Sequence, residues 1–128
     1  MGSRLEGLTK EYGATAIVSE TTRAQLPPEF VVRELDIVRV KGKKEPIKIF
    51  ELIGLDSALD EKLKHRLAHF STGLAKYRSM KFKEAIIDFE RAAHEGDKPS
   101  KMYISRCEHF IEEHPGKNWD CVWTMKTK

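Results

Sequence analysis

The strongest constraint on the fold of this chain is a change in its hydrophobic pattern near residue 55. Before that point, short helical stripes alternate with runs of β-branched residues; after it, the spacing of apolar residues is helical almost to the end. One stripe continues over five turns at intervals of three or four and consists of Leu59, Leu63, Leu67, Phe70, Leu74 and Tyr77. The pattern predicts an α+β fold, with a small mixed domain followed by an all-α helical-hairpin tail.

Helix signals frame the beginning of the mixed domain. Leu5, Leu8 and Tyr12 form one stripe of a short helix, and Gly13 follows where a left-handed residue would end it. Ser19 is a good N-cap for a second short helix, which Pro27 would end.

A β-hairpin is predicted over residues 30–52. Residues 30–40 form a β-branched run whose alternation slips between Ile37 and Val38, so we expect either burial on both faces or a bulge. A polar turn at residues 42–45 leads to a second alternating run that begins after Pro46.

Two further helices are expected in the tail, over residues 82–93 and 102–111. Asp56 or Ser57 could cap the long helix before them, and Ser100 the last one. The aromatic segment at 119–125 is expected to pack back as an extended segment or a short strand.

Composition excludes several classes of protein. Hydrophobic residues make up 40% and charged residues 34% of 128 residues, which is typical of a globular protein, and no apolar run could span a membrane. The net charge of +3 is spread among both signs, so we expect no nucleic-acid partner. Two cysteines, Cys107 and Cys121, are too few for a disulfide scaffold, and we expect reduced thiols and a cytoplasmic location.

Two blocks of sequence resemble the end of the catalytic domain of bacterial class III adenylate and guanylate cyclases. The first comprises residues 4–8 (RLEGL), 12–13 (YG) and 17–22 (IVSETT); the second comprises residues 33–36 (RELD) and 40–52 (VKGKKEPIKIFEL). Their order and spacing are also similar to that family. The resemblance implies a partial cyclase sheet over residues 4–54, followed by the helical tail over 57–128.

The resemblance also implies site residues. Arg4 matches the arginine that stabilises the transition state, and Lys41 matches a lysine that contacts the nucleotide phosphates. It places the metal-binding aspartates and the purine-reading residues upstream of this sequence. The intact parent would therefore use Mg²⁺ or Mn²⁺ to convert ATP or GTP into a cyclic nucleotide, with cyclic AMP favoured. This fragment, without a metal site or cofactor of its own, is expected to be inactive.

The second half resembles a single tetratricopeptide repeat. The positions that carry the resemblance are Gly73, Phe82, Ala85, Phe89 and Ala92. Residues 99–107 and the Trp119-Asp120 pair resemble the tail of bacterial cyclases of the CHASE2 type. In those proteins glycine commonly follows Trp-Asp, so Cys121 puts a left-handed turn at this position in doubt.

Other residue groups have plainer interpretations. His65 and His69 have zinc-ligand spacing but no nearby third ligand, so a solvated helix face is favoured. Cys107, near His109, lies on an apolar helix side and is expected to act as a small hydrophobe rather than a nucleophile. A basic patch of Lys41, Lys43, Lys44 and Lys48 reads as a solvated turn, apart from the role that the resemblance gives Lys41.

The aromatic residues near the C-terminus leave two interpretations open. Phe110, Trp119 and Trp123 would either form a partner-binding surface or, as we favour, cap the open end of the helical repeat. At the level of function, the alternative to a cyclase fragment is a non-catalytic interaction or dimerisation module. We expect either a homodimer or a sheet edge covered by the C-terminal tail, because a partial sheet exposes edges and faces that pair with whatever is available.

Overall fold

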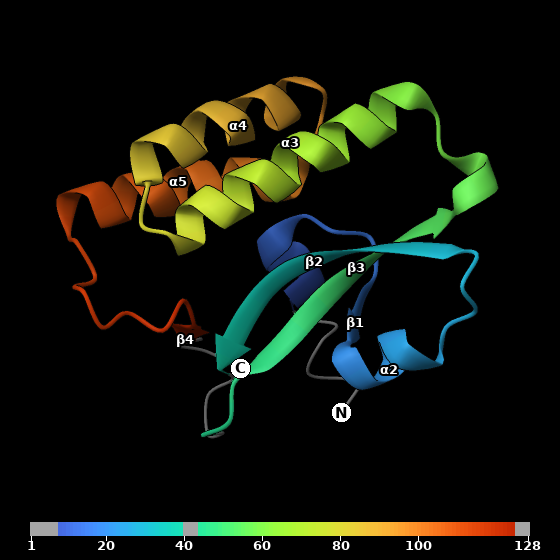
Figure 1. Ribbon diagram of the computed structural model, residues 1–128, viewed down its shortest axis with the longest axis horizontal. Coiled ribbons are helices and arrows are strands. Elements are labelled where there is room, and N and C mark those ends of the chain that lie inside the picture. Colours follow the sequence, from blue (N-terminus) through green and yellow to red (C-terminus); the bar gives the residue numbers. More distant parts are fainter. Residues whose placement is uncertain (1–7, 40–43, 125–128) are drawn as a thin grey trace. The chain divides into compact units, whose positions relative to one another are not determined.

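The computed structural model describes residues 8–39 and 44–124 of the chain. These residues form two compact units. The first unit contains the described residues up to Ala58 and those from Asp120 onward, whereas the second spans Leu59–Trp119. The first is built around a sheet and the second is helical (Figure 1). The predicted α+β class is confirmed.

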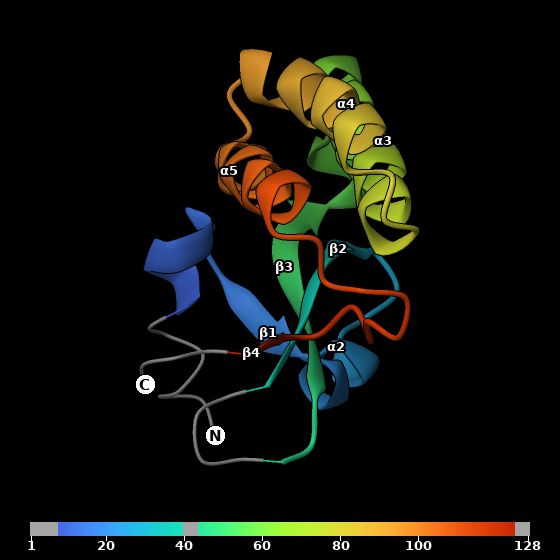
Figure 2. The ribbon, with the colours of Figure 1, turned by 90° about the vertical axis from the view of Figure 1, so that its left-hand side faces the viewer.

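The sheet of the first unit has four strands. They are β1 (Ile17–Ser19), β2 (Phe30–Arg39), β3 (Ile47–Leu55) and β4 (Trp123–Thr124), in the spatial order β1-β3-β2-β4. Strand β3 pairs antiparallel with both β1 and β2, so the predicted hairpin is confirmed. Within the aromatic C-terminal segment, Trp123 and Thr124 form β4, which pairs parallel to the end of β2 and lies in the first unit (Figure 2).

A bulge in β2 explains the broken alternation of this strand. The register with β3 shifts between Glu34 and Asp36, where Leu35 is the extra residue of the bulge, and a second shift lies between Val31 and Val32. Leu35, Asp36 and Val38 are all fully buried. The slip predicted between Ile37 and Val38 therefore exists as a bulge, but it begins earlier in the strand.

Short helices precede the hairpin as predicted. Residues 8–12 are helical and Gly13 follows with φ 69°, the left-handed conformation that favours glycine. Helix α2 (Glu20–Gln25) begins after Ser19, whose hydroxyl accepts a hydrogen bond from the Thr22 N–H at 3.2 Å. Both helix signals read from the sequence are thus confirmed over the described residues, and Leu5 of the first stripe lies outside them.

The second unit consists of three helices: α3 (Glu61–Arg78), α4 (Phe82–His94) and α5 (Lys98–Glu112). Two predicted N-caps were wrong. Asp60, not Asp56 or Ser57, caps α3 by accepting from the Leu63 N–H at 2.8 Å, and residues 56–58 form a 3-10 turn of the first unit.

The N-cap of helix α5 lies three residues before the predicted cap, Ser100. Asp97 is the N-cap, and its Oδ2 accepts hydrogen bonds from both the backbone N–H and the hydroxyl of Ser100. Pro99 fits because the first turn of a helix has no use for its missing N–H. A carboxylate at the helix start also faces the positive end of the dipole, which favours aspartate over serine there.

Aromatic rings fill the core of the second unit. Phe89 of α4 stacks on Tyr103 of α5, with ring centroids 4.9 Å apart and an interplanar angle of 13°. Phe70 of α3 packs on both rings at 5.6 and 5.7 Å. Gly73 faces the same cluster, since a Cβ added there would lie 2.9 Å from Phe89 Cε1. The helices α3 and α4 can pack at this distance only because residue 73 has no side chain.

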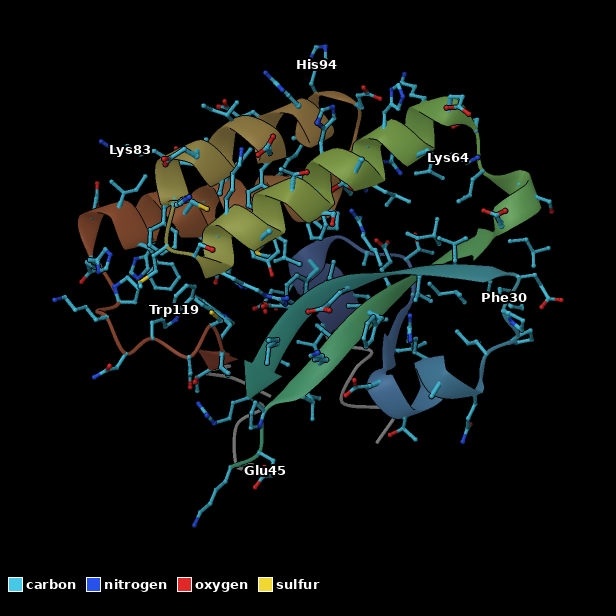
Figure 3. All side chains as sticks on the ribbon, in the orientation of Figure 1. Phe30, Glu45, Lys64, Lys83, His94 and Trp119 are labelled. Carbon is cyan, nitrogen blue, oxygen red and sulfur yellow. The ribbon has the colours of Figure 1, made fainter. Side chains whose placement is uncertain are left out.

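Trp119 closes one end of this core. Its ring lies 5.1 Å from that of Tyr77, 5.7 Å from that of Phe82 and 5.2 Å from that of Phe110 (Figure 3). The favoured interpretation as a cap therefore holds for Trp119, whereas Trp123 belongs to the sheet. Among the described residues, no helix combines the length and the apolar character needed to cross a bilayer.

Replacing Gly73 by alanine is expected to destabilise the second unit. The new methyl group would press on a ring that Tyr103 holds from its other side, and overpacking of this kind costs roughly 1–3 kcal/mol. That loss exceeds the gain of about 1 kcal/mol from the higher helix propensity of alanine. Urea unfolding followed by circular dichroism measures the difference. The exposed Ser71→Ala on the same helix is the control, and a Gly73→Ala protein as stable as the control would contradict this packing.

Candidate functional site

Both site residues predicted from the sequence, Arg4 and Lys41, lie outside the described residues. Strand β2 ends at Arg39 and β3 begins at Ile47, so Lys41 belongs to the connection between the two strands of the hairpin. Glu45, near the start of β3, is exposed and marks this end of the hairpin in Figure 3. The described part of the candidate site consists of the groups that hold the ends of this connection.

A cavity of about 540 Å³ lies beside this end of the hairpin. Its lining residues come from α2 and the residue before it, and from the two hairpin strands; they are Ser19, Glu20, Thr21, Thr22, Ile37, Pro46, Ile47 and Lys48. The hydroxyls of Ser19 and Thr22 already bond to each other at the helix cap. The cavity thus offers one ammonium and one carboxylate group, Lys48 and Glu20, on a largely apolar wall.

Arg39 is the most connected side chain at the end of β2. Its Nε donates to the carbonyl oxygen of Lys44 at 3.0 Å, and its Nη1 donates to Thr124 Oγ1 at 3.2 Å. Its Nη2 lies 3.6 Å from Asp120 Oδ2. One guanidinium therefore contacts the end of the hairpin connection, strand β4 and the turn before β4. The sequence carried no signal for this residue, because Thr124 lies 85 positions away.

A buried ion pair joins the two long strands. Arg33 on β2 and Glu51 on β3 lie opposite each other, with Nη2 and Oε1 2.6 Å apart and Nε donating to the same oxygen at 2.8 Å. Their side chains are only 9% and 10% exposed. The other oxygen of Glu51 accepts from the Thr15 N–H at 3.3 Å. The arginine and the glutamate therefore hold the sheet together and are not available to a ligand.

A second carboxylate is buried just beyond the bulge. Asp36 Oδ2 accepts a hydrogen bond from the Tyr12 hydroxyl, and its Oδ1 accepts from the Ile37 N–H at 2.8 Å. Both Asp36 and Tyr12 are fully buried. This contact fixes the helical segment 8–12 to β2. In the stretches that the structure describes, no group of three or more His, Cys, Asp or Glu residues is placed to hold a metal ion.

The cysteine and histidine candidates have structural environments. Cys107 is fully buried, and burial raises the pKa of its thiol to about 12, so the group stays protonated at neutral pH. The expectation of a small hydrophobe is confirmed. His65 is exposed and His69 partly exposed on α3, in keeping with a solvated helix face.

Cys121 corrects an expectation about the turn before β4. The residue adopts φ 66°, so the left-handed turn forms although cysteine replaces glycine. Asp120 shapes this turn by accepting from the Val122 N–H at 3.0 Å, an interaction typical of aspartate in turns. The strain of a left-handed residue with a Cβ is therefore tolerated at this position.

Comparison with known proteins relates the chain to adenylate cyclases. It is 33% identical over 113 residues to the terminal-differentiation specific adenylate cyclase of Dictyostelium discoideum, a match covering 84% of this chain and 5% of that protein. It is 44% identical over 55 residues to an adenylate cyclase of Anabaena cylindrica and 32% identical over 60 residues to adenylate cyclase 1 of Rhizobium meliloti. These two matches cover 41% and 47% of this chain.

The chain spans between 5% and 11% of the length of these three relatives. No family model matches it, and no solved structure is significantly similar to it. The Dictyostelium match is too long to fit within the first unit, so the similarity to an adenylate cyclase extends into the helical unit.

The two thiols are expected to differ in reactivity. A pKa of about 12 in place of 9.0 lowers the thiolate fraction of Cys107 at pH 8 roughly a thousandfold, and burial blocks access as well. Titration of the native protein with a thiol-specific disulfide reagent should therefore modify Cys121 alone, and urea should release the second thiol. A Cys121→Ser protein is the control, in which native labelling should vanish. Rapid native labelling of that variant would contradict the environment described for Cys107.

Glycine at position 121 is expected to stabilise the protein. Cysteine in the left-handed conformation costs roughly 1 kcal/mol that glycine does not. The gain is reduced by the larger entropy that glycine has in the unfolded chain. Thermal unfolding should give a higher midpoint for Cys121→Gly than for Cys121→Ala, which keeps the Cβ. Equal midpoints for the two variants would contradict the strain.

Proposed function

We propose that this chain is the C-terminal part of the catalytic region of an adenylate cyclase and contributes phosphate-binding groups to its active site. The observation that carries the proposal is the 33% identity to the Dictyostelium adenylate cyclase over 84% of the chain. All three relatives reported above are named adenylate cyclases, which supports cyclic AMP over cyclic GMP as the product of the intact parent. The two motif blocks support the assignment to class III.

Two cations are assigned to the reaction. In cyclisation the 3′ oxygen of the nucleotide attacks the α-phosphorus, the bond to the β-phosphate oxygen breaks and pyrophosphate leaves. Negative charge builds on the phosphoryl oxygens, and a guanidinium or ammonium group aimed at them stabilises it. We assign Arg4 to the charge that develops in the transition state and Lys41 to the nucleotide phosphates, as the resemblance implies.

The described carboxylates do not fit a metal site. Asp36 bonds to Tyr12 and to the backbone, and Glu51 is paired with Arg33, so neither is placed with other carboxylates around an ion. Divalent ions such as Mg²⁺ or Mn²⁺ would be held by other parts of the parent. We therefore propose that this fragment alone is inactive and that the complete site forms in the longer protein, as a homodimer on the cytoplasmic side of any membrane.

The helical unit is proposed to be a tetratricopeptide-like hairpin of the CHASE2-type tail. The support is local: Gly73 faces Phe89 closely enough to exclude a Cβ, and Ala85 and Ala92 are fully buried. Small residues at these places let two antiparallel helices approach. The second candidate function, a non-catalytic interaction module, is favoured by Ile87 and Ile111, which are 53% and 40% exposed.

Enzyme assays of the intact parent test the cyclase proposal. With ATP and Mn²⁺ the parent should form cyclic AMP, and Arg4→Ala and Lys41→Ala should each lower kcat/KM by about a hundredfold, as loss of one charge-stabilising donor does elsewhere. Lys44→Ala, three residues further on, is the matched control and should stay near wild type. The isolated 128-residue chain should give no product. A Lys41→Ala parent with unchanged kinetics, or turnover by the isolated chain, would overturn the assignment.

A further inference from the structure

We infer that Arg39 is a positioning residue: it ties the end of the hairpin connection that carries Lys41 to the C-terminal segment Asp120–Thr124. This inference rests on the proposed function, because it gives the C-terminal segment a task in phosphate binding. The segment would act as a brace of the sheet unit. Three observations carry the inference.

The first observation is that the guanidinium of Arg39 contacts three different groups. Each of the three nitrogens of Arg39 has a different partner: Nε the Lys44 carbonyl, Nη1 the Thr124 hydroxyl and Nη2 the Asp120 carboxylate. The partners come from two segments far apart in sequence. Because the guanidinium is planar and rigid, fixing any two of these contacts places the third. An ammonium group has no such fork and could not hold all three together.

The second observation is that Arg39 itself belongs to the ladder between β2 and β4. Within the described residues, that ladder pairs Val38 with Trp123 and Arg39 with Thr124. The Arg39 side chain adds contacts to Thr124 and Asp120 from the same position, so its backbone and its guanidinium both hold the C-terminal segment.

The third observation is that Asp120, which faces the guanidinium of Arg39, is also held by the turn before β4. Asp120 Oδ1 accepts from the Val122 N–H while its Oδ2 faces Arg39, so one carboxylate both forms the turn and receives the guanidinium. Cys121, between Asp120 and Val122 in the sequence, adopts the left-handed conformation. The turn directs the chain into β4 and presents Thr124 to Nη1.

The link to phosphate binding lies at Lys44. Lys41 is in the connection between β2 and β3, and the far end of that connection is held by the bond from Arg39 to the Lys44 carbonyl. The near end begins at Arg39 itself. The same side chain therefore fixes the span that the connection must cover. Without Arg39 the far end of the connection would lose its bond at Lys44, and we expect nucleotide binding to weaken more than the chemical step.

Hydrogen exchange of this chain tests the brace without any activity. In Arg39→Ala, amide exchange at residues 122–124 should rise about three- to tenfold, as expected for the loss of a few partly exposed polar contacts. Arg39→Lys should behave like Arg39→Ala, because charge alone does not restore the fork. Arg23→Ala is the matched control: this arginine lies over the Phe50 ring in the same unit and makes no contact with β4 in any interaction described here. Unchanged exchange in Arg39→Ala, or full rescue by lysine, would overturn the brace.

Kinetics of the intact parent test the consequence for the site. Arg39→Ala and Asp120→Ala should each raise KM for ATP about three- to tenfold with a smaller change in kcat, and the double variant should resemble either single one, since both break the same unit. A merely structural loss would lower the active fraction and hence kcat instead. An active parent whose KM is unaffected by Arg39→Ala would overturn the positioning role. A parent that makes no cyclic AMP would sink the proposed function, whereas the exchange experiment would still decide on the brace.

Discussion

Strands β2 and β3 pair along nearly their whole length, and each of the other two strands of the sheet attaches to one of them. Strand β1 pairs with β3, and β4 pairs with β2. Both short strands therefore depend on the long pair for their place in the sheet. The helical segment at 8–12 depends on the same pair, because the Tyr12 hydroxyl bonds to Asp36 on β2. The bulge in β2 lets Leu35 and Asp36, neighbours in sequence, both be buried.

Buried charges in the first unit serve the sheet. Removing a carboxylate and a guanidinium from water is costly, and the pair Arg33–Glu51 offsets this only because two donors of the arginine meet one oxygen while the Thr15 N–H satisfies the other. Asp36 is satisfied in the same way on both oxygens. These acidic groups are thus fully occupied, so a cyclase built on this unit would need carboxylates from elsewhere to bind ions.

The sequence predicted the elements better than it predicted their ends. Period and propensity were enough for the hairpin, for α2 and for the three long helices, because those signals are local. The caps of α3 and α5 were missed since several polar residues stood near each helix start, and only the folded backbone selects Asp60 and Asp97. Arg39 carried no signal at all, because its partners are distant in sequence and come together only when β4 joins the sheet. Of the two site residues inferred by resemblance, Arg4 and Lys41, both lie outside the described residues.

In the chain, the helical unit lies between two strands of the same sheet. The chain leaves the sheet at Leu55 and returns to it at Trp123, with α3, α4 and α5 between. If that stretch were a flexible chain, closing it would cost roughly 4 kcal/mol. A folded helical unit has already lost most of that freedom. The free energy of closing this stretch is therefore smaller when the helical unit is folded, and the similarity to the Dictyostelium adenylate cyclase extends into that helical unit as well as the sheet.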